Sequence, residues 1–107
     1  MTYAARELNT RVQIQKVTRI RDPLGGDREV WSTFAETFAK VEPLVGREFI
    51  AAQAEHSELT AKVTMRWRAD VNQLHRVMIR GEAYGIISAQ NIRYQNRELL
   101  LYVKRLA

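Results

Sequence analysis

The chain contains no cysteine, two prolines and two histidines among its 107 residues. Without cysteine there is no disulfide framework and no thiolate metal site, and the composition fits a reducing compartment. No stretch approaches the roughly 20 consecutive apolar residues that a membrane-spanning helix needs, and the first ten residues lack the apolar core of a signal peptide. We therefore expect a soluble protein made in a cytoplasm, with no membrane partner.

The residue types that carry catalysis or bind metals are scarce and unsuitably spaced. His56 and His75 match no HExxH or other metal-ligand pattern, no serine stands in a GxSxG motif, and no glycine-rich phosphate motif is present. Four carboxylates lie close in sequence, without a sign of the pocket that a general acid-base pair needs: Glu42, Glu48, Glu55 and Glu58. The sequence therefore predicts a protein that is not an enzyme, with no catalytic residue, no metal site and no cofactor.

Positive charge exceeds negative charge, and arginine supplies most of it. Seventeen Lys and Arg against twelve Asp and Glu give a formal net charge of +5, and thirteen of the cations are arginine. Arginine suits bidentate pairing with carboxylates or phosphates. Because the basic residues are interleaved with acidic ones, the balance permits a nucleic-acid partner and equally fits a solvated mixed surface.

Alternation of apolar and polar residues, the pattern of a half-buried strand, recurs through the chain. The clearest case is the run from Leu59 to Trp67, where every second residue is apolar. Extended runs are predicted at residues 11–20, 29–41, 58–68, 77–79, 84–87 and 98–104. This spacing predicts a mainly β fold, a small six- to seven-stranded β-barrel or a two-sheet sandwich, in one domain over residues 1–107. Residues 1–10 are expected to form a flexible N-terminal arm.

Three local sequences predict turns or irregularities. Residues 22–27, DPLGGD, predict a loop because proline fixes one φ and paired glycines permit positive φ. Gly81-Glu82 predicts a two-residue type II′ hairpin turn with glycine first. Lys16 and Val17 interrupt the alternation of their strand, which predicts a bulge or register change near them.

The longest interruption of the strand pattern lies between Pro43 and Glu58. Pro43 has no backbone N–H and should end the preceding strand. Residues 47–54 are mostly good helix formers, with Phe49, Ile50 and Ala54 at helical spacing, and predict one short α-helix in a long inter-strand loop. Long insertions in small β domains are more often functional than decorative, so this loop is the candidate functional segment.

The strand at 58–68 also bears on nucleic-acid binding. A single-strand reader would present aromatic and cationic side chains on one face. Trp67 has the opposite parity to Lys62, Arg66 and Arg68. We therefore assign Trp67 to the core and the three cations to a basic stripe, suited to phosphate contact without sequence reading.

A series of short motifs in order covers nearly the whole chain: Leu8-Asn-x-Arg11-Val-x-Ile14-Gln15, the loop at 22–27, Trp31, VEPLVGREF at 41–49, VTMRWR at 63–68, and Gly81-x-x-Tyr84-x-Ile86. Together these motifs resemble the tailed-phage head-tail joining family, also called head-closure, stopper or head-tail adaptor proteins. Phe38 stands where many members carry tryptophan, a change that keeps an aromatic side chain.

The resemblance implies a virion protein that assembles as a homo-oligomeric ring, commonly twelve-fold, in the head-tail connector below the portal and adaptor proteins. There it would retain the packaged double-stranded DNA by closing the channel, and would offer a platform to tail proteins, after synthesis in the bacterial host cytoplasm. The long loop would face the channel or a partner through Arg47, Glu48, Phe49, Ile50, Gln53, His56 and Glu58. Candidates for ring contacts or for facing DNA are the basic residues Arg11, Lys62, Arg66 and Arg68.

Two other functions fit the same sequence. The positive charge and the excess of arginine fit a free-standing OB-like or SH3-like barrel that binds nucleic acid non-specifically. A tail-terminator-type ring component of the same particle is the other possibility.

Overall fold

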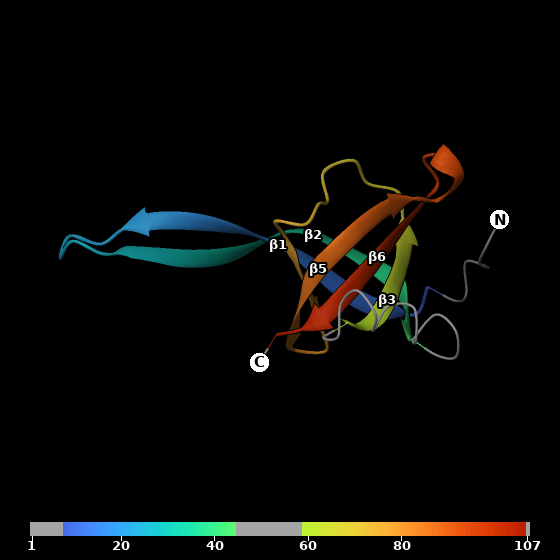
Figure 1. The fold of residues 1–107 in the computed structure, drawn as a ribbon, viewed down its shortest axis with the longest axis horizontal. Coiled ribbons are helices and arrows are strands. Elements are labelled where there is room, and N and C mark those ends of the chain that lie inside the picture. The colour runs from blue at the N-terminus through green and yellow to red at the C-terminus, as the bar shows by residue number, and fades with distance from the viewer. Residues whose placement is uncertain (1–7, 45–58, 107) are drawn as a thin grey trace.

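The computed structural model describes residues 8–44 and 59–106, in which six strands close into one barrel (Figure 1). Along the chain the elements are β1 (Thr10–Arg21), β2 (Asp27–Pro43), β3 (Leu59–Arg66), β4 (Arg76–Ile79), β5 (Glu82–Asn91), the 3-10 turn η2 (Ile92–Tyr94) and β6 (Glu98–Arg105). Around the barrel the order is β1-β2-β3-β6-β5-β4, and all neighbouring strands are antiparallel. Over those two ranges, no helix is long and apolar enough to cross a membrane.

The mainly β fold and the small barrel predicted from the sequence are confirmed. Pro43 is the last residue of β2, as its missing N–H predicted. Two other predictions concern segments outside the described residues: the short helix within 47–54 and residues 1–7 of the N-terminal arm.

Aliphatic side chains from all six strands fill the barrel. On β3 and β6 the buried hydrophobic side chains stand at alternate positions, because successive residues of a strand point to opposite faces. The largest fully buried side chains are Ile14, Met65, Leu99, Leu101, Val12, Val63, Val77 and Val103. Trp67 lies partly buried against this cluster, which agrees with its assignment to the core.

A two-stranded hairpin projects from the barrel and gives the molecule its long axis (Figure 1). β1 pairs with β4 only from Val12 to Gln15, and β2 pairs with β3 only from Ala39 to Pro43. Beyond these stretches β1 and β2 pair only with each other, up to the turn at 22–26. We call residues 16–32 the hairpin extension. It stretches the molecule to 51 Å, against 29 and 26 Å along the other two axes.

A register shift between Ile14 and Gln15 lies at the root of the hairpin extension. Ile14 pairs with Ala35 and Gln15 pairs with Thr33, so Phe34 is an extra residue on β2. The irregularity predicted near Lys16 and Val17 therefore occurs, slightly earlier in the strand. A bulge of this kind bends the strand and increases its twist, which suits the point where the hairpin leaves the barrel wall.

The turn between β4 and β5 differs from its prediction by one residue. Ile79 pairs with Glu82, so the two turn residues are Arg80 and Gly81, with φ of 52° and 83°. Positive φ at both positions is the geometry of a type I′ turn, in which glycine stands second. The predicted type II′ turn over Gly81-Glu82 is wrong, because Glu82 is already needed in the ladder of β5.

Gly81→Ala is expected to lower the free energy of unfolding by about 1–2 kcal/mol, since an L side chain is strained in the left-handed region. Gly26→Ala is the matched control, because an added Cβ meets open space at both positions and only Gly81 has positive φ. Urea unfolding of both variants measures the difference. Equal losses would show that backbone conformation at Gly81 is not what the turn depends on.

Candidate assembly surfaces

Arg76 of β4 contacts side chains of both β1 and β2 on the outward face at the root of the hairpin extension. The Arg76 guanidinium carbon lies 4.4 Å from the ring centroid of Trp31, a cation–π contact. Arg76 Nε also donates to Gln15 Oε1 at 2.8 Å, and Gln15 Nε2 donates to Thr33 Oγ1 at 3.1 Å. These contacts join β4 to β1 and β2 where the hairpin leaves the barrel, and so hold the direction of its base.

Phe34, the extra residue of the register shift, packs on the loop before β4. Its ring centroid lies 4.7 Å from that of His75, with the planes tilted by 60°. His75 Nδ1 accepts a hydrogen bond from the backbone N–H of Asn72 at 3.3 Å. Burial lowers the pKa of His75 below its usual 6.5, Asp70 raises it, and Lys16 lowers it further. The neutral imidazole is therefore the form that fits this site.

Stability is expected to fall as the pH is lowered from about 7.5 to about 5.5. His75 has a lowered pKa in the folded chain, so below about 6.5 the unfolded chain binds more protons and is favoured. His75→Gln should lose part of this pH dependence, as measured by urea unfolding at both pH values. An NMR titration that places the pKa of His75 above 6.5 would contradict the assignment.

The two strands of the hairpin extension carry opposite net charge. β1 contributes Lys16, Arg19 and Arg21, and β2 contributes Asp27, Arg28 and Glu29. The strands therefore carry +3 and −1 there. Although the register places Arg19 opposite Glu29 and Arg21 opposite Asp27, none of the six forms an ion pair with any residue that the structure describes. These charges are available to another molecule.

Phe38 is an exposed aromatic residue on the outer face of β2. Its side chain is 52% exposed, and the guanidinium carbon of Arg11, its register partner on β1, lies 5.9 Å from the ring centroid. Arg11 Nε also lies 3.1 Å from Glu36 Oε1. Aromatic residues and arginine are enriched in protein–protein interfaces, so this group is a candidate contact surface.

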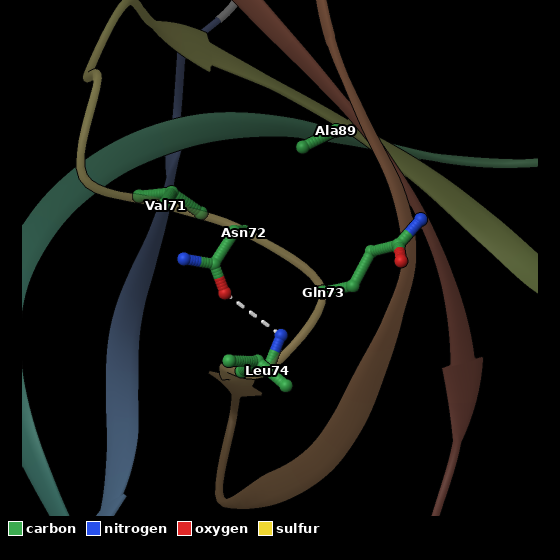
Figure 2. Close-up of a pocket in the computed structure, with 5 residues that line it drawn as sticks. All are labelled: Val71, Asn72, Gln73, Leu74 and Ala89. Carbon is green, nitrogen blue, oxygen red and sulfur yellow. Dashed lines mark hydrogen bonds between the residues drawn. The ribbon is translucent and has the colours of Figure 1, made fainter.

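A hollow of about 390 Å³ lies beside the loop between β3 and β4, and Figure 2 shows five residues that line it. Its lining residues are Val71, Asn72, Gln73, Leu74 and Ala89. Asn72 Oδ1 accepts from the backbone N–H of Leu74 at 2.8 Å, and Gln73 Nε2 donates to the carbonyl of Ile87 at 2.7 Å. The loop is thus fastened to itself and to β5. These five side chains are apolar or uncharged amides, a lining that suits contact with another protein.

Comparison with known proteins decides which class of function these surfaces serve. The sequence profile described as phage head completion protein matches residues 3–106. The chain belongs to the phage head completion protein family. This membership confirms the resemblance to head-tail joining proteins and gives the chain a structural role at the phage head. The family is not an enzyme family, as the sequence predicted.

Three individual proteins are similar to this member of the family. Head completion protein gp7 of Enterobacteria phage HK97 is 34% identical over 74 residues, which cover 69% of this chain and 66% of the phage protein, just under two thirds of its length. Protein SF1141 from Shigella flexneri 2a has a TM-score of 0.70 at 22% identity, covering 92% of this chain and 93% of that one. A chain in the virion of a native gene transfer agent particle has a TM-score of 0.60 at 14% identity, covering 92% and 94%. The last two show a shared fold.

The sequence assigned Lys62, Arg66 and Arg68 to a basic stripe and named Arg11 as a separate candidate. Lys62 and Arg66 lie on β3, but Arg68 lies beyond the end of that strand and Arg11 lies on β1. Arg68 donates from Nε and Nη2 to the two Asp70 oxygens at 3.0 and 2.8 Å, which raises the pKa of Arg68 and lowers that of Asp70. Their role in ring or DNA contacts stays a prediction.

The predicted channel or partner loop lies outside the described residues: Arg47, Glu48, Phe49, Ile50, Gln53, His56 and Glu58. The structure describes only the strands that hold its ends. Pro43 of β2 pairs with Ala61 of β3, so the loop leaves and re-enters the barrel on neighbouring strands. The function assigned to those seven residues stays a prediction.

Sequence reasoning missed the hairpin extension and the contact of Trp31 with Arg76. It predicted both strands and the loop between them, but not that they continue beyond the barrel. The available signal was length: β1 has 12 residues and β2 has 17, well above the usual strand of about 5–6.

Proposed function

We propose that the chain forms a ring in the head-tail connector, below the portal and adaptor proteins, where it closes the DNA channel after packaging and offers a platform to tail proteins. The family match over residues 3–106 carries this proposal. A projecting hairpin with available charges and an exposed Phe38 surface support it, because a ring needs complementary patches on different sides of each copy. The head-tail joining family implies twelve copies.

The loop after β2 is the part that we assign to the channel or to a partner. Neighbouring strands hold its two ends, so its base is anchored on the barrel. In this proposal Phe49 and Ile50 anchor the loop, and the polar residues available to neighbours or to the channel are Arg47, Glu48, Gln53, His56 and Glu58.

Non-specific binding of nucleic acid is the alternative that the net charge of +5 favours. Arg11 is paired with Glu36 and Arg68 with Asp70, which leaves these two arginines less suited to phosphate contact. Arg66 is exposed at the end of β3. Contact between Arg66 and DNA at a channel wall therefore fits better than autonomous DNA binding.

Mixing the purified chain with its cognate portal and adaptor complex tests the proposal. A ring added to that complex, seen by electron microscopy and analytical ultracentrifugation, is the expected result. A chain that stays monomeric alone and in the mixture would count against the ring. A salt titration with double-stranded DNA separates the alternative, since a free-standing DNA binder shows micromolar or tighter affinity and a steep salt slope.

A further inference from the structure

The hairpin extension has two open strand edges. Residues 16–21 of β1 and 27–32 of β2 pair with each other and with no other strand that the structure describes. Figure 1 shows this part of β1 and β2 standing clear of the other labelled strands. Each open edge presents unpaired backbone N–H and C=O groups, which are a template for another strand.

Charge distinguishes the two edges. The β1 edge carries +3 and the β2 edge −1, and none of these side chains is neutralised by an ion pair within the described part of the chain. Pairing of two β1 edges would bring six cations together, whereas a β1 edge beside a β2 edge joins opposite charges. Electrostatic complementarity of this kind selects the partner edge and the register.

We propose that the hairpin extensions of neighbouring copies pair edge to edge, β1 of one copy against β2 of the next, so that a continuous antiparallel sheet runs around the ring. This inference rests on the proposed ring and names the surface that builds it. The occupant of each edge is a second copy of this chain, because one element carries both of the complementary edges.

The symmetry of a ring agrees with this arrangement. Copies related by rotation point their extensions the same way, so β1 of one copy runs antiparallel to β2 of the next. The contact is heterologous, joining different surfaces on the two copies, and such contacts close into rings when the rotation allows. Pairing also protects both open edges, which would otherwise promote uncontrolled association.

A charge-swapped chain tests the inference. Arg19→Glu and Arg21→Glu combined with Asp27→Lys and Glu29→Lys change the net charges to −1 on β1 and +3 on β2. Opposite charges still face each other within the hairpin, so the fold is kept, which circular dichroism checks. The swapped chain should form rings with itself, because its two edges remain complementary. Mixed rings with wild type would bring like charges together, and should be depleted at least roughly tenfold against random mixing.

Native mass spectrometry measures how many wild-type and charge-swapped chains each ring contains. The rings are formed on the cognate portal and adaptor complex, with one of the two chains isotopically labelled. The control combines Glu82→Lys with Arg105→Glu, which swaps an ion pair of 2.7 Å on the barrel wall and should mix randomly with wild type. Random mixing of the charge-swapped chain, or a folded swapped chain that forms no ring, overturns the inference while the ring itself stands. Wild type that adds no ring to the complex removes the ring and the inference together.

Discussion

Leu101→Ala is expected to lower the free energy of unfolding by about 2–5 kcal/mol, as for other large-to-small substitutions in a packed core. Leu101 is fully buried on β6, opposite Val63 of β3 and Ala89 of β5. Both neighbouring strands are hydrogen-bonded in the closed barrel, so they can move only partly into the cavity that the substitution leaves. Urea unfolding monitored by tryptophan fluorescence measures the loss.

Leu24→Ala is the control for this measurement. The same atoms are removed, but Leu24 is 95% exposed at the tip of the hairpin extension, and its loss should change stability by no more than about 0.5 kcal/mol. If both variants unfolded at the same urea concentration, the barrel interior would not be the main source of stability.

Phe38→Ala is expected to weaken binding of the chain to its cognate portal and adaptor complex by about 30-fold or more, the size of effect seen for an interface hot spot. Phe38 is half exposed beside Arg11 on the outer face of β2, so its removal should leave the barrel almost as stable as wild type. Surface plasmon resonance measures the binding, and thermal unfolding measures the stability.

Tyr94→Ala provides a matched aromatic control, since Tyr94 is 91% exposed and lies on η2, a different element from the β2 strand of Phe38. Wild-type binding by Phe38→Ala would remove the Phe38 surface from the proposed assembly. A similar loss in both variants would point to a general effect of exposed aromatic residues.

Much of the barrel could be predicted because the local sequence of a half-buried strand alternates between apolar and polar residues. The buried hydrophobic residues of β3 and β6 are visible in the sequence as a period of two, and Pro43 marks the end of β2 by its missing N–H. The turn before β5 was predicted one residue too late. Gly81 is consistent with either primed turn type from local sequence, and the pairing of Ile79 with Glu82 selects between them.

The assembly surfaces were harder to predict because they arise where a strand has no neighbouring strand on one edge. Alternation reports whether a side chain points to a core, but not whether a strand has a partner on its edge. The structure shows that Arg19 of β1 lies opposite Glu29 of β2 and that no other described strand pairs with this stretch. Only then is it visible that the two open edges differ in net charge. The sequence likewise contained no sign of the contact of Trp31, since its partner Arg76 lies on another strand.

The extra residue Phe34 has a consequence for how this region tolerates change in length. Thr33 and Ala35 pair with the consecutive residues Gln15 and Ile14, so the ladder skips Phe34, and the facing of the residues from Ser32 back to Asp27 does not depend on it. Deleting Phe34 would therefore give a regular ladder that keeps Trp31 on the face of Arg76, and would remove the bend at the root of the hairpin extension together with the contact with His75. The loss of one residue at this position should therefore be tolerated more readily than in the regular ladder on either side, where a one-residue change moves every following side chain to the other face.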